Sequence, residues 1–91
     1  MPEHESEASR VLGVRLRQRR RELELNQESV AHRAGLNVSN YARIDRGNGN
    51  PTFHTLIRLA DVLSLEVADL VTGLTKEQLP PDRDSVGLVD P

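Results

Sequence analysis

The chain contains no cysteine among its 91 residues. It can therefore form neither disulfide bonds nor thiolate metal sites, and this composition favours a reducing compartment. No apolar run approaches membrane-spanning length, and nothing at the N-terminus resembles an apolar signal segment. We expect a cytoplasmic protein that does not bind membranes, with one small hydrophobic core that a partner subunit would help to stabilise.

Recognisable catalytic motifs are also missing. The chain has no HExxH spacing, glycine-rich phosphate loop or GxSxG elbow. The nearest approach to a dyad is His54 with Asp61, but seven positions along one helix separate them by about 10.5 Å, too far for a hydrogen bond. His4 lies between two glutamates, in what we interpret as a tail. We therefore expect no enzyme, cofactor, metal site or small-molecule ligand.

The net charge of −2 hides a strong asymmetry along the chain. Residues 1–9 carry −3 and residues 47–91 carry −4, whereas residues 10–46 carry nine arginines against four acidic residues, a net +5. Local positive charge steers a protein toward phosphate, so this stretch indicates a nucleic-acid partner. For Arg15, Arg19 and Arg21, a solvated helix face is an equally good interpretation.

The stretch Gln27–Gly47 has the pattern of two short helices joined by a tight turn. Apolar residues recur on one helical face up to Ala34, and Gly35 then supplies the left-handed backbone that ends a helix. Asn37 is a good N-cap for a second helix, whose apolar residues also share one face. Two helices connected in this way form the unit that places its second helix in the DNA major groove.

The residues of this stretch also resemble a known family, the phage-repressor and Cro group, or xenobiotic-response-element (Xre) family. The resemblance runs without a gap from about Val11 to Leu70, and it is carried by Gln27-Glu28, Ala31, Arg33-Ala34-Gly35-Leu36, Ser39, Arg43-Ile44-Asp45-Arg46-Gly47 and Asn50-Pro51-Thr52. It implies an all-α fold, a compact five-helix repressor-like DNA-binding domain with the helix-turn-helix at helices 2 and 3.

Helix and tail boundaries follow from the caps and apolar spacing. We expect residues 1–8 to form a flexible acidic tail, residues 9–73 the helix-turn-helix domain, and residues 74–91 a C-terminal tail with at most one extra helical turn before disorder. The first helix should span Ala8–Leu23, and Thr52 should cap the fourth. Ser64 and Glu66 stand where the family commonly has glycine and a small capping hydroxyl, which leaves the ends of helices 4 and 5 open.

The resemblance assigns roles to residues around the second helix of the motif. The positions that match base-reading residues are Val38, Ser39, Asn40 and Arg43. We expect contacts to the DNA backbone from Gln27, which also braces the reading residues, and from Asn37, Arg46, Asn48 and Asn50. Two further matching positions, an arginine and an acid, predict an ion pair beneath the motif between Arg20 and Asp45.

The apolar surface between residues 56 and 71 is larger than one helix face needs. Its surplus predicts a homodimer interface formed by Leu56, Leu63, Leu65, Val67, Leu70 and Val71, although a small core could absorb it all. The sequence therefore indicates a homodimeric transcriptional repressor or autoregulator that binds double-stranded DNA at an inverted-repeat operator. The alternatives are a protein-binding adaptor or coactivator without base readout, and a controller or antitoxin-type regulator of a restriction or toxin system.

Overall fold

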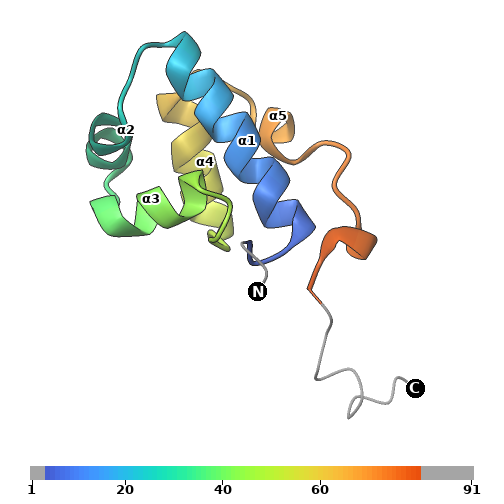
Figure 1. The fold of residues 1–91 in the computed structure, drawn as a ribbon. Helices are drawn as coiled ribbons and strands as arrows, with labels where there is room; N and C mark the ends of the chain where they lie inside the picture. Colours follow the sequence, from blue (N-terminus) through green and yellow to red (C-terminus); the bar gives the residue numbers. More distant parts are fainter. Residues whose placement is uncertain (1–3, 81–91) are drawn as a thin grey trace.

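The computed structural model describes residues 4–80, and this part of the chain folds into five α-helices and a final 3-10 turn, without strands (Figure 1). The elements are α1 (Glu7–Glu22), α2 (Gln27–Ala34), α3 (Val38–Asp45), α4 (Phe53–Val62), α5 (Val67–Val71) and η1 (Lys76–Gln78). The helix α1 packs against α3 and α5, and α4 packs against α2 and α5. The predicted all-α class, with the helix-turn-helix at α2 and α3, is confirmed. None of these helices is long and apolar enough to cross a membrane.

The helices begin where the sequence supplies a capping side chain. Asn26 accepts a hydrogen bond from the Ser29 amide at 2.7 Å, and Thr52 accepts one from the Thr55 amide at 3.1 Å. At the start of α1, Ser6 accepts from the Ser9 amide at 3.0 Å. Because Ser6 is the cap, α1 begins one residue before the predicted start and includes the last two residues of the segment that we expected to be a tail.

Two residues that differ from the family pattern have local explanations. Ser64 follows α4 with a φ of 56°, the left-handed conformation that glycine adopts more easily. The backbone amide of Glu66 donates to the Asp69 carboxylate at 2.8 Å, so a reciprocal side chain stabilises the start of α5 in place of a capping hydroxyl. The fourth helix therefore ends at Val62 and the fifth begins at Val67 without the glycine and the capping hydroxyl that the family commonly has.

The hydrophobic core lies between the five helices. Its buried apolar residues are Leu12, Leu16, Val30, Ala31, Ala34, Tyr41, Ile44, Leu59, Ala60, Leu63 and Leu70. The assignment of Leu63 and Leu70 to a dimer interface is wrong, because both side chains are fully buried within the chain. The other four residues of that predicted interface are half-buried and pack against the core from outside.

The turn after α3 lies directly against α1, where Gly13 permits a close approach. A Cβ atom on Gly13 would lie 2.7 Å from the backbone nitrogen of Gly47 and 2.9 Å from the carbonyl oxygen of Asp45. The hydroxyl of Ser9 also donates to the carbonyl oxygen of Gly49 at 2.8 Å. These contacts fix the end of α3 on α1, and the sequence pattern did not predict them.

The last described element is the extra turn η1. The backbone amide of Thr75 donates to the side-chain carbonyl of Gln78 at 2.7 Å, which is the reciprocal contact expected from the sequence. The disorder predicted after Pro80 concerns residues 81–91, which lie outside the described residues, as do residues 1–3 of the predicted acidic tail.

Candidate nucleic-acid interface

The helix α3 presents opposite faces to the core and to solvent. Tyr41 and Ile44 are buried. The four predicted base-reading residues, Val38, Ser39, Asn40 and Arg43, are all exposed. The outer face of α3 is therefore a short polar surface with one valine, and it projects side chains that can donate and accept hydrogen bonds.

The predicted backbone-contacting residues lie at both ends of α3. Asn37 precedes the helix, and its side chain accepts a hydrogen bond from the Asn40 amide at 3.2 Å. Arg46 and Asn50 are exposed beyond the other end of α3, and Asn48 is half-buried in the turn between them. Asn37 therefore has a structural role in capping α3, whereas Arg46 and Asn50 extend into solvent beside it.

A buried carboxylate, that of Asp45, fixes α3 to its neighbours. The predicted ion pair is present: Arg20 donates from Nε to Oδ1 at 3.0 Å and from Nη2 to Oδ2 at 3.1 Å. Gln27 donates to Oδ2 at 2.8 Å, and the Tyr41 hydroxyl donates to Oδ1 at 2.9 Å. Asp45 has no exposed surface, so its charge is stabilised by these four hydrogen bonds and not by water.

Gln27, at the start of α2, contacts the end of α3. Its side-chain amide nitrogen donates to Asp45, the last residue of α3, and its expected contact with the DNA backbone stays a prediction. The bracing part of its expected role is present. The hydroxyl of Tyr41 is a further member of this network that the sequence did not identify, because apolar spacing alone marked that residue as core.

The electrostatics of Asp45 follow from this arrangement. Burial alone would raise the pKa of its carboxyl, but the hydrogen bonds from Arg20, Gln27 and Tyr41 outweigh burial and hold the pKa below its ordinary value. The same contact with Asp45 raises the pKa of Arg20. Burial, together with the nearby Asp45 charge, raises the pKa of the Tyr41 hydroxyl. The tyrosine therefore remains a neutral donor, and the carboxyl remains a charged acceptor.

Several arginines of α1 hold other helices in place. Arg15 donates to the carbonyl oxygen of Leu70 at 3.1 Å, and Arg19 donates to that of Leu63 at 2.9 Å. Arg15 and Arg19 thus satisfy carbonyl groups at the C-terminal ends of α5 and α4, where a cation is also favoured by the helix dipole. These two arginines are therefore more than a solvated helix face, because each binds another helix. Arg21, the third residue of that set, is exposed.

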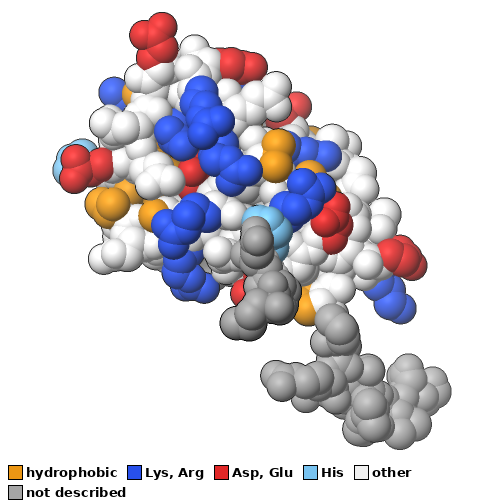
Figure 2. Space-filling model, in the orientation of Figure 1, with side chains coloured by type: hydrophobic (Ala, Val, Ile, Leu, Met, Phe, Trp, Pro, Cys, Tyr) orange, Lys and Arg blue, Asp and Glu red, His pale blue; other side chains and the backbone are white. Residues whose placement is uncertain are grey.

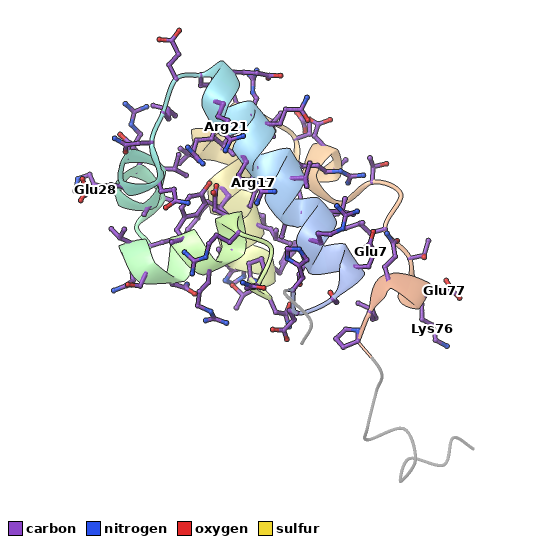
Figure 3. The ribbon with its side chains drawn as sticks, in the orientation of Figure 1. Glu7, Arg17, Arg21, Glu28, Lys76 and Glu77 are labelled. Atoms are coloured by element: carbon purple, nitrogen blue, oxygen red, sulfur yellow. The ribbon has the colours of Figure 1, made fainter. Side chains whose placement is uncertain are left out.

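The remaining positive charge gathers on one side of the molecule. Figure 2 shows arginine side chains over α1 and α3 on the same face, with most acidic side chains toward the rim of this view. Figure 3 places Arg17 and Arg21 on the side of α1 that is turned toward α2 and α3. Arg17 also donates a hydrogen bond to the carbonyl oxygen of Asp45, the last residue of α3. The basic surface of α1 therefore continues onto the end of α3.

Comparison with known proteins places this arrangement among regulators. Residues 11–73 match the family model described as a helix-turn-helix domain. An uncharacterized HTH-type transcriptional regulator of Sinorhizobium fredii, y4dJ, is 36% identical over 63 residues, which cover 69% of this chain and 82% of that protein. The cryptic phage CTXphi transcriptional repressor RstR of Vibrio cholerae is 29% identical over 56 residues, which cover 62% of this chain and 50% of that protein.

Solved structures show the same fold. The restriction-modification controller protein C.AhdI from Aeromonas hydrophila is 32% identical with a TM-score of 0.66, covering 68% of this chain and 94% of that one. The biofilm regulator SinR, solved in complex with DNA, is 30% identical with a TM-score of 0.61, covering 65% and 95%. These proteins are transcriptional regulators and not enzymes, which confirms the family resemblance and the functional class expected from the sequence.

Replacing Arg20 with alanine should destabilise the protein by about 2 to 4 kcal/mol, because it leaves the buried Asp45 carboxylate without its main partner. Unfolding by urea, followed by circular dichroism, measures this loss. The control is Arg10→Ala, which breaks the exposed pair between Arg10 and Glu7 on the same helix and should change stability much less. Equal losses for the two variants would show that burial of the Asp45 pair adds nothing.

The lowered pKa of Asp45 predicts how stability depends on pH. In the folded chain the pKa of the Asp45 carboxyl lies below its ordinary value of 3.8. The contribution of the charged carboxyl to the free energy of unfolding is therefore complete above that pH, and it is lost as the pH falls through the folded-state pKa. The stability advantage of wild type over Asp45→Asn should be constant above about pH 5 and shrink below about pH 4. An advantage that persists unchanged at lower pH would contradict this assignment.

Proposed function

Because the chain belongs to the helix-turn-helix domain family of transcriptional regulators, we propose that it reads double-stranded DNA in a sequence-specific manner, with α3 in the major groove. One observation carries the proposal: the outer face of α3 is polar and exposed, and a buried network holds it rigidly beside a basic surface. Residues 9–73 form the DNA-binding domain in this proposal. A rigid reading helix supports specificity because little ordering is needed on binding.

The four residues on the outer face of α3 have the chemistry for base readout. Arg43 can donate two hydrogen bonds to O6 and N7 of a guanine, and Asn40 can pair with N6 and N7 of an adenine. Val38 can cover the methyl group of a thymine, while Ser39 can donate to or accept from several base edges. An acidic or strongly apolar face would have favoured the adaptor alternative, and this face does not have that composition.

Residues at the end of α3 would hold the DNA backbone. Arg46 and the turn with Asn48 and Asn50 follow the reading helix, at the point where the chain leaves the groove and can cross phosphates. Asn37 lies at the N-terminal end of α3, where its backbone and side chain would face the phosphates of the DNA backbone. Such contacts position the helix but do not distinguish sequences. Their loss should weaken binding to every sequence alike, whereas loss of Arg43 should also change the sequence preference.

We also propose that two copies form a twofold dimer through α4 and α5. With Leu63 and Leu70 in the core, the surface available to a partner consists of the half-buried residues Leu56, Leu65, Val67 and Val71, together with the exposed side chain of Ile57. A second exposed apolar residue on α4, Phe53, extends this surface. The two reading helices would then lie about 34 Å apart, on an inverted repeat whose half-site centres are about 10 to 11 base pairs apart.

The regulatory setting is a repressor or autoregulator. RstR is a phage repressor, and C.AhdI is the controller of a restriction-modification system. The 32% identity to C.AhdI favours such a controller as the second candidate. Both candidates use the same DNA-binding face, so the experiments below test what they share.

Replacing Arg43 and Arg46 one at a time separates base reading from backbone contact. Arg43→Ala should weaken binding to the preferred duplex by about 1 to 3 kcal/mol and relax the preference at one base pair per half-site. Arg46→Ala should weaken preferred and scrambled duplexes alike and lower the salt-dependence slope by about one per contact removed. Fluorescence anisotropy over a salt series measures both.

Lys76→Gln serves as the control for this comparison, because Lys76 is an exposed cation on η1, remote from α3 (Figure 3). It should leave both duplexes bound as in the wild type. If neither arginine variant changes affinity for any duplex while circular dichroism shows an intact fold, the α3 face has another purpose and the proposed function fails.

Replacing Ile57 with aspartate tests the dimer. The side chain is 42% exposed, so the single chain should tolerate the charge, whereas a partner surface would bury it without compensation. Sedimentation velocity at micromolar concentration should show a dimer for the wild type and a monomer for Ile57→Asp. Val14→Asp is the matched control, since Val14 is 38% exposed on α1, outside the proposed interface, and should remain dimeric. A monomeric wild type would refute the proposed interface.

A further inference from the structure

We infer that α1 provides a second DNA contact, in which Arg17 and Arg21 hold backbone phosphates beside the groove that α3 reads. The inference rests on the proposed function and adds a helix outside the helix-turn-helix to the interface. Nothing in the motif requires it, because a helix-turn-helix can in principle bind with α2, α3 and the following turn alone.

The first argument is position. Arg17 and Arg21 are four residues apart on α1, so they share one helix face, and their Cα atoms are separated by about 6 Å along the helix axis. Arg17 donates to the carbonyl oxygen of Asp45, which places its guanidinium at the C-terminal end of α3. Both side chains lie on the side of α1 that is turned toward the motif (Figure 3). A phosphate strand beside α3 would therefore pass over them.

The second argument is charge. Glu22, the acidic residue next to Arg21, forms an ion pair with Arg19 at 3.2 Å. Within residues 4–80, the ion pairs of α1 involve Arg10, Arg19 and Arg20, and none involves Arg17 or Arg21. Neither guanidinium group is therefore neutralised by a carboxylate of the described residues; Arg21 is exposed, and Arg17 is half-buried. Two arginines without an acidic partner are well suited to neutralise phosphates and release counterions.

The third argument is shape. Arg17 and Arg21 border a shallow hollow of about 470 Å³ on the surface of α1, together with Val14, Gln18 and Glu22. The hollow is open to solvent, and Val14 is the one apolar residue among the five that line it, whereas sites for small ligands enclose them. Gln18 is exposed and adds an amide donor to the lining of the hollow. An extended backbone crossing this surface can contact all three side chains in succession.

Arg21→Gln tests the inference, because Arg21 makes no hydrogen bond within the described chain that its loss would break. The full chain is assayed on the preferred duplex and on a scrambled duplex, and Lys76→Gln is the control for the loss of one positive charge. The variant should weaken binding to both duplexes by the same factor, roughly five- to tenfold at about 0.1 M salt, and lower the salt slope by about 0.9 for each phosphate released.

Ethylation interference identifies the phosphate itself. On wild-type protein, ethylation of the phosphates that face α1 should block binding, and at one position per half-site the block should disappear with Arg21→Gln. An unchanged ethylation pattern, an unchanged salt slope, or a loss restricted to the preferred duplex would each overturn the inference while leaving readout by α3 intact. A wild-type chain that binds no duplex would instead overturn the proposed function, and this contact with it.

Discussion

The buried charge of Asp45 is the interaction on which the rest of the structure depends. A carboxylate without solvent contact is costly unless its hydrogen bonds are made, and here Arg20, Gln27 and Tyr41 supply them from α1, α2 and α3. Because each donor comes from a different helix, the position of α3 is tied to the other two helices at one point. The outer face of α3 can therefore be polar, because the contacts of its inner face hold the helix in place.

The arginines of α1 divide into two groups that composition cannot separate. Arg15 and Arg19 bind the carbonyl ends of α5 and α4, and Arg20 binds Asp45, so these three cations stabilise the fold. Arg17 and Arg21 lie on the side turned toward α3 (Figure 3). The helix therefore both holds its neighbours in place and contributes positive charge to the proposed interface, which explains why a protein with a net charge of −2 has a basic face.

Features set by local chemistry were predictable from the sequence, and features set by packing were not. The caps at Asn26 and Thr52 and the glycine that ends α2 depend on neighbouring residues, so the helix boundaries followed closely. The ion pair of Arg20 followed from the family pattern. The burial of Leu63 and Leu70 was missed, because apolar spacing shows that a residue faces inward or toward a partner but does not distinguish the two. The use of Gln27 on Asp45 depends on how the helices come together, which no local pattern encodes.

The geometry and the family together support a DNA-binding regulator, in which a fixed α3 reads bases and the surrounding cations hold phosphates. Selection of duplexes from a random pool by the full 91-residue chain tests this claim most directly. The account predicts that the recovered sequences converge on an inverted repeat, with half-site centres about 10 to 11 base pairs apart. A pool that remains random after selection, with a chain that is folded by circular dichroism, would contradict it.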